Sequence, residues 1–180
     1  ITALPPFIFE GCWYLSSVKL PSTLTSIGEH AFTSCHSLSS IDIPDSVEII
    51  GAQAFESASF KTIKLPSKLK AISSHCFGYC SELTSIEIPE GVTSIESYAF
   101  DNCSNLTNIE LPSTLDKIGK LAFTGCISLE SITLPSSLIE IGDYAFSAES
   151  YYDPASSTVC KSLKSVNIEP NSKLTTIGEC

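Results

Sequence analysis

Cysteine and histidine are the residue types in this chain that could bind a metal, form disulfides or act as nucleophiles. The 180 residues include eight Cys and three His. Eight cysteines allow 105 pairings if all are bridged. Their positions favour another role, because Cys12, Cys35, Cys80, Cys103 and Cys126 follow one another at intervals of 23 or, once, 45 residues. Side chains in one phase of a repeat form a column, so we expect buried free thiols that act as small apolar groups.

The remaining cysteines and the histidines offer little further chemistry. Cys76 precedes Cys80 by four residues and is the predicted partner of any local disulfide, while Cys180 is expected to be exposed and able to cross-link chains. His30 and His75 share a repeat position two rungs apart. That separation is about 10 Å, too far for one zinc ion, so we expect surface histidines rather than ligands.

The motif content and the composition exclude several function classes. No C-x-x-C, H-E-x-x-H, G-x-S-x-G or phosphate-loop motif occurs. We therefore expect no enzyme activity, no cofactor and no metal. The formal net charge is -10 and Arg is absent, which disfavours nucleic-acid binding. No apolar run approaches about 18 residues, so no membrane insertion is expected in this segment.

An internal repeat organises the chain. Phe recurs at 9, 32, 55, 77, 100, 123 and 146, and Pro at 21, 44, 66, 89, 112 and 135, in steps of 22 or 23 residues. The copies align as C-x-x-L-x-x-I-x-L-P-x-x-L-x-x-I-G-x-x-A-F-x-x. Six complete units begin at Cys12, Cys35, Ala58, Cys80, Cys103 and Cys126. Residues 1–180 are thus predicted to form a single repeat solenoid, truncated in mid-repeat at both ends.

Each unit is expected to form one coil of this solenoid. The alternation in Ser40-Ile41-Asp42-Ile43 predicts a strand with one buried face, and the following Pro ends it. A second short alternation precedes Gly, which is expected to permit a tight bend. The Ala-Phe pair then predicts a single helical or 3₁₀ turn. The predicted fold is an α/β repeat solenoid: right-handed, β-rich, with a parallel sheet and short helical or 3₁₀ turns.

The spacing L-x-x-I-x-L-P-x-x-L-x-x-I-G-x-x-A-F-x-x-C resembles the 23-residue BspA-like class of leucine-rich repeat over the whole chain apart from one insertion. The resemblance implies a cell-surface or secreted protein whose array binds host proteins, such as matrix or plasma glycoproteins, and mediates adherence. On that basis we expect a non-catalytic, adhesin-like protein-binding module. A structural spacer or self-associating scaffold remains the alternative, because open strand edges could pair end to end.

Two parts of the chain are candidate binding surfaces. On the outward face of the predicted sheet, the second position of each rung carries Lys19, Asp42, Lys64, Glu87 and Glu110, and the first four alternate in charge, which predicts pairing across adjacent strands. This face is either a binding surface or an ordinary solvated one.

The second candidate surface is an insertion at residues 147–159, which is predicted to form a loop beside the coils. Tyr151 and Tyr152 within it are candidate anchors for a partner. Neutral drift in loop length explains the insertion equally, because added loop residues cost little stability.

Overall fold

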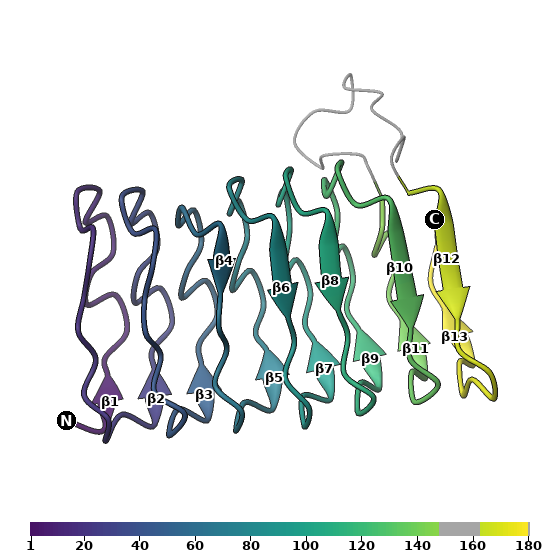
Figure 1. Ribbon diagram of the computed structural model, residues 1–180, viewed down its shortest axis with the longest axis horizontal. Coiled ribbons are helices and arrows are strands. Elements are labelled where there is room, and N and C mark those ends of the chain that lie inside the picture. Colours follow the sequence, from purple (N-terminus) through teal and green to yellow (C-terminus); the bar gives the residue numbers. More distant parts are fainter. Residues whose placement is uncertain (148–162, 180) are drawn as a thin grey trace.

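The computed structural model describes residues 1–147 and 163–179, which wind into a stack of similar coils. One row of strands comes from the segment that precedes each Pro. These strands lie side by side across the view in Figure 1: β4 (Thr62–Ile63), β6 (Ser85–Glu87), β8 (Asn108–Glu110), β10 (Ser131–Leu134) and β12 (Ser165–Ile168). Successive coils therefore present a continuous outer face, which we call the front face.

A second row of short strands comes from the alternation that precedes the Gly position. It runs along the lower edge of Figure 1 and comprises β1 (Ala3–Leu4), β2 (Ser26–Ile27), β3 (Ile49–Ile50), β5 (Ala71–Ile72), β7 (Ser94–Ile95), β9 (Lys117–Ile118), β11 (Glu140–Ile141) and β13 (Thr176–Ile177). Hydrogen bonding divides this row into β1-β2-β3 and β5-β7-β9-β11-β13. Every strand pair of the described residues is parallel, which confirms the predicted repeat solenoid with a parallel sheet.

The core follows the predicted inward positions. In the coil that begins at Cys80, the seven side chains expected to point inward are at most 4% exposed: Leu83, Ile86, Ile88, Val92, Ile95, Ala99 and Phe100. The repeated phenylalanines form a continuous stack from Phe9 to Phe146, with ring centroids 5.3–5.8 Å apart and interplanar angles of 1–21°. No coil could bury these rings alone, so each coil depends on its neighbours.

The predicted helical or 3₁₀ turn at Ala-Phe is wrong, because no helix occurs in the part of the chain that the structure describes. These residues consequently include no helix long and apolar enough to cross a membrane. The segment consists of consecutive β-turns, as in Thr33, whose N–H donates to His30 O at 3.2 Å. His30 and Ser34 have φ of 54° and 59°, which a right-handed helix cannot contain. Alternate N–H groups reach the next coil instead, as Phe32 N donates to Ala54 O at 2.8 Å.

A tight turn begins at the repeated Gly, as expected, since Ala54 N donates to Gly51 O at 3.3 Å. Close packing between coils, however, is what excludes a side chain at this position. A Cβ on Gly51 would lie 2.4 Å from Glu29 N, and one on Gly119 would lie 2.6 Å from Ser97 N. Real Cβ atoms do not approach backbone so closely, so these two positions exclude a side chain unless the coils move apart. Neither residue has a positive φ, which shows that backbone conformation is not what selects Gly here.

Candidate functional site

The strands β6 and β8 place polar side chains in register on the front face. Ser85 and Glu87 flank Ile86, which is 4% exposed and points into the core. Period-2 alternation therefore turns the two polar residues outward. Parallel pairing sets Ser85 opposite Asn108 and Glu87 opposite Glu110. The front face thus carries one column of hydroxyl and amide groups beside one column of charged groups.

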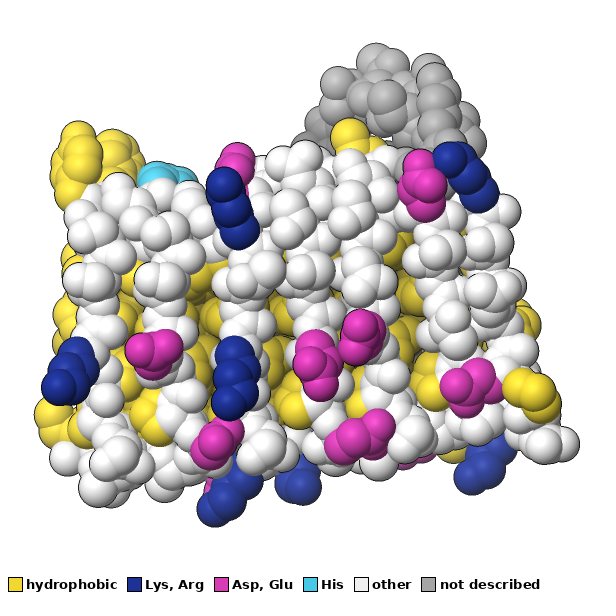
Figure 2. All heavy atoms as spheres, viewed as in Figure 1, with side chains coloured by type: hydrophobic (Ala, Val, Ile, Leu, Met, Phe, Trp, Pro, Cys, Tyr) yellow, Lys and Arg dark blue, Asp and Glu magenta, His cyan; other side chains and the backbone are white. Residues whose placement is uncertain are grey.

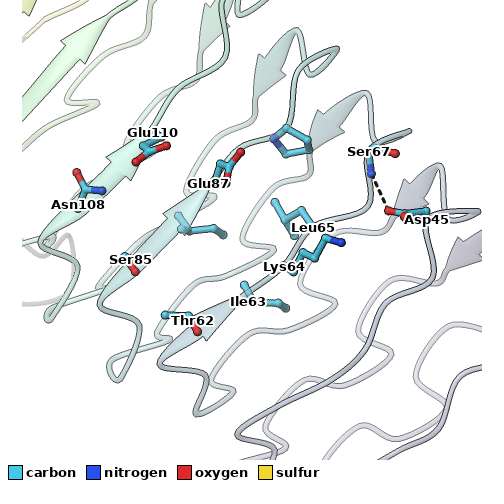
Figure 3. Close-up of a pocket in the computed structure, with 12 residues that line it drawn as sticks. Asp45, Thr62, Ile63, Lys64, Leu65, Ser67, Ser85, Glu87, Asn108 and Glu110 are labelled. Carbon is cyan, nitrogen blue, oxygen red and sulfur yellow. Dashed lines mark hydrogen bonds between the residues drawn. The ribbon is translucent and has the colours of Figure 1, made fainter.

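A groove of about 570 Å³ runs over β4, β6 and β8. Figure 3 shows Lys64, Glu87 and Glu110 on successive strands across it. Asp45 and Ser67, which lie in the turns that follow Pro, add to the lining, and Ser67 N donates a hydrogen bond to Asp45 Oδ1 at 3.4 Å. The groove is open and its lining mixes polar with apolar residues, so it suits a segment of another macromolecule better than a small molecule that must be enclosed.

The charged side chains of the groove are not used within the protein. Among the described residues, Lys64, Glu87 and Glu110 take part in no ion pair of 4.0 Å or less and in no side-chain hydrogen bond. The predicted alternation of charge along the column is present in the sequence, but Lys64 does not pair with Asp42 or with Glu87. These charges are consequently available to a partner.

A second hollow continues the groove toward β10 and β12. It has a volume of about 280 Å³ and includes Asn108, Glu110, Thr133 and Glu169 among its lining residues. Glu169 lies just after β12, and its Oε2 accepts a hydrogen bond from Ser136 N at 2.9 Å. The polar surface therefore spans several rungs of the front face rather than a single pocket.

The candidate binding residues predicted on the front face divide into two groups. Lys64, Glu87 and Glu110 line the groove. Lys19 and Asp42 are exposed but lie outside the groove lining.

Tyr151 and Tyr152, with the insertion at 147–159 apart from Ser147, lie outside the described residues. Their proposed role as anchors for a partner stays a prediction.

Sequence reasoning missed the contribution of the turns after Pro. Asp45 and Ser67, in these turns, line the groove, and Glu169, just before Pro170, lines its continuation. On the front face, however, the predicted binding residues were strand positions alone. A signal was present, because Asp45 directly follows Pro44 and Ser67 follows Pro66. The turn after a strand stands beside the face of that strand, so its polar residues border the same surface.

The cysteine column is buried, as its phase predicted. Cys80 and Cys103 are fully buried, and their Sγ atoms donate to Phe55 O and Phe77 O of the preceding coil, each at 3.1 Å. Burial raises the pKa of the Cys80 thiol to about 12. The thiolate is the nucleophilic form, so this buried thiol is chemically inert at neutral pH. Cys12 differs because it is exposed.

The two histidines that share a repeat position have different surroundings. His30 Nδ1 lies 3.3 Å from Thr33 Oγ1. His75 Nδ1 is buried without a hydrogen-bond partner, and Gly78 occupies the position that corresponds to Thr33. Burial lowers the pKa of His75. Among residues 1–147 and 163–179, no group of three or more His, Cys, Asp or Glu is placed to hold a metal ion.

One buried carboxyl lies in the turns. Asp101 is 3% exposed, and its Oδ1 accepts a hydrogen bond from Asn102 Nδ2 at 2.5 Å. Burial raises the pKa of Asp101 to about 6, although the hydrogen bonds from Asn102 and Tyr79 oppose that shift. Glu56 also raises this pKa through its like charge, so the carboxyl is held by its surroundings in the turns.

Comparison with known families matches this geometry to a repeat family. The model of the BspA type leucine rich repeat region matches residues 2–104 and 70–180, with six copies. The chain belongs to the BspA-type leucine-rich-repeat family. Comparison with curated protein sequences found no match.

Solved structures of leucine-rich-repeat proteins share the fold. A leucine-rich cell-surface protein from Faecalibacterium prausnitzii is 31% identical with a TM-score of 0.74, and the alignment covers 96% of this chain and 44% of that protein. A leucine-rich repeat protein from Eubacterium ventriosum is 28% identical with a TM-score of 0.68, covering 78% and 39%. One from Bacteroides ovatus is 24% identical with a TM-score of 0.63, covering 99% and 55%. This BspA-type chain spans about half the length of such proteins.

Proposed function

We propose that this chain is a non-catalytic protein-binding module whose front face contacts a partner protein. The observation that carries the proposal is the set of unpaired charges, Lys64, Glu87 and Glu110, which lie together over the groove. A sheet whose every rung is held by its neighbours keeps these side chains at fixed spacing, which lowers the entropic cost of binding. The family is a repeat family, and such arrays present extended surfaces to proteins.

The proposal also concerns the location of the protein that contains this module. One structural neighbour is described as a cell-surface protein, and the resemblance to BspA-like proteins suggests host matrix or plasma glycoproteins as partners. We propose that this chain likewise belongs to a cell-surface or secreted protein with an adhesin-like role. The described front-face groove has no aromatic lining residue, so each contact is expected to be weak and adhesion to depend on multiple copies.

The test replaces Lys64, Glu87 and Glu110 together by Ser. Binding to immobilised fibronectin and fibrinogen is measured by surface plasmon resonance, and a serum pull-down widens the search. The matched control replaces Asp116, Lys117 and Glu140 by Ser. It changes the charge equally on the β9 and β11 side, where Lys117 and Glu140 form an ion pair at 3.2 Å. Loss of binding in the first variant alone supports the proposal. If both variants bind equally well, the front face is not the binding surface.

The second candidate is a self-associating scaffold, in which copies of this repeat array associate with one another through strand edges. Light scattering across a range of protein concentrations tests this candidate, and a constant molar mass rejects it.

A further inference from the structure

We propose that the front-face groove binds a cationic, extended segment of the partner protein, with Lys or Arg side chains placed against Glu87 and Glu110. The inference rests on the proposed function and names the chemistry of the partner. Its starting point is the register of β6 and β8, in which Glu87 lies opposite Glu110. Adjacent strands lie about 4.8 Å apart, so the register places two glutamates directly opposite each other on neighbouring strands.

Like charges directly opposite each other destabilise a sheet. Nothing in the described part of the chain relieves this pair: neither carboxylate has an ion pair within 4.0 Å, and Lys64 on the neighbouring strand does not reach Glu87. Elsewhere the protein does pair acids with lysines, as Lys117 with Glu140 at 3.2 Å and Lys164 with Glu130 at 2.8 Å. A bound cation placed between Glu87 and Glu110 would remove the repulsion, and a partner can supply it.

The charge balance of the groove favours the same class of partner. Its lining has three acids, Asp45, Glu87 and Glu110, against one base, Lys64, and the adjoining hollow adds Glu169. Figure 2 shows basic and acidic side chains alternating on the left of this face and acidic ones over its middle and right, with further charged side chains of both signs along its edges. A surface of one sign steers partners of the opposite sign and repels others. Lys64 lies in the coil between those of Asp45 and Glu87, so the longest uninterrupted acidic stretch of the groove is Glu87 with Glu110.

The remaining lining suits the backbone of an extended chain. Thr62, Ser85 and Asn108 contribute hydroxyl and amide groups on three adjacent strands. Such groups donate and accept hydrogen bonds with peptide N–H and C=O groups along the groove. An unstructured peptide can adopt this shape, whereas a folded partner needs a projecting loop.

A peptide selection distinguishes the possible outcomes. A phage-displayed library of linear 12-residue peptides is selected on the intact protein, with counter-selection on the variant in which Lys64, Glu87 and Glu110 are Ser. Enrichment of Lys and Arg among groove-dependent peptides supports the inference. Enrichment of acidic or uncharged peptides overturns it while leaving the groove as a protein-binding site. A selection that yields no groove-dependent peptide overturns both this inference and the proposed function.

A defined probe then tests the two glutamates. Fluorescence anisotropy measures the Kd of a labelled seven-residue peptide that alternates Ser with Lys, and of its counterpart with Glu in place of Lys. The double variant Glu87→Gln, Glu110→Gln is expected to weaken binding of the Lys peptide about threefold to tenfold, since exposed ion pairs contribute modestly. The control Asp116→Asn, Glu140→Gln makes the same charge change on the other strand row and is expected to leave the Kd unchanged. Equal weakening by the control, or tighter binding of the Glu peptide, contradicts the inference.

Discussion

Replacement of Gly78 by Thr is expected to stabilise the protein by completing a hydrogen bond that another coil already makes. In the coil of His30, Thr33 Oγ1 lies 3.3 Å from His30 Nδ1 and also donates to Gln53 O at 2.6 Å. In the coil of His75, the equivalent position is Gly78 and His75 Nδ1 is buried without a partner. A threonine hydroxyl at residue 78 would stand beside that nitrogen.

The space around Gly78 admits a Cβ atom. A Cβ there would lie 3.4 Å from His75 O and 3.6 Å from His75 Nδ1, which are ordinary contacts, and Gly78 does not have a positive φ. Loss of glycine flexibility in the unfolded chain contributes about 0.4–1 kcal/mol. A hydrogen bond to the buried nitrogen contributes about 0.5–1.5 kcal/mol. Together they predict about 0.9–2.5 kcal/mol of stabilisation, or a rise in melting temperature of about 2–10 °C.

The matched control is Gly78→Val, since Val has the shape of Thr without the hydroxyl. Melting temperature and urea unfolding are measured for both variants at pH 8. Burial lowers the pKa of His75 from its usual value of 6.5, so stability is lost as pH falls below about 6.5, where only the unfolded chain binds the proton. At pH 8 this residue is neutral in both states. If Gly78→Val is as stable as Gly78→Thr, the hydrogen-bond argument is refuted.

Three further predictions concern the turns, the thiols and the coil spacing. The pKa of Asp101 is raised from 3.8 to about 6, so its ionisation destabilises the fold as pH rises. In thermal melts, the stability of Asp101→Asn relative to the unchanged protein should therefore increase between about pH 4 and pH 7. A difference that does not change with pH would contradict this. In the native protein, the exposed Cys12 should react with iodoacetamide much faster than the buried Cys80 and Cys103, as followed by mass spectrometry. Equal labelling rates would contradict the burial of the cysteine column. Gly119→Ala should lower the free energy of unfolding by about 1–3 kcal/mol in urea, because its Cβ would lie 2.6 Å from Ser97 N. Glu96→Ala, in the same repeat position, should lower it far less. Similar losses in the two variants would show that coil spacing does not select Gly.

The repeated pattern predicted the core because each apolar position is averaged over several copies. Ile86 and Ile95 are buried as expected, and Glu87 is exposed. The turns could not be predicted in the same way. Tyr98 and Leu121 adopt φ of 61° and 56°, although neither residue type favours the left-handed region. Tertiary stacking of coils imposes that conformation, and a single sequence carries no sign of it.

The candidate site was predictable only in part, for a related reason. Alternation along a strand decides which side chains point outward, so Lys64, Glu87 and Glu110 could be named from the sequence. Whether opposite charges on neighbouring strands meet depends on side-chain direction and distance, and no ion pair forms among these three. The limits of the groove depend also on the turn that carries Asp45, whose position follows from the coil as a whole.

The shortened repeat that begins at Ala58 explains where the regular stacking changes. Phe60 replaces the usual Leu there, and its ring meets Phe55 edge-on at 5.6 Å. The widest step in the phenylalanine stack, 5.8 Å, follows between Phe55 and Phe77. At this step the β3 and β5 strands are not hydrogen-bonded to each other. Ser73 Oγ donates to Ile50 O, where other coils use the backbone N–H of the residue in the Gly position, as Gly51 and Glu96 do. The first strand of the front-face groove, β4, belongs to this same repeat. One end of the groove therefore lies where the regular stacking of the coils is interrupted.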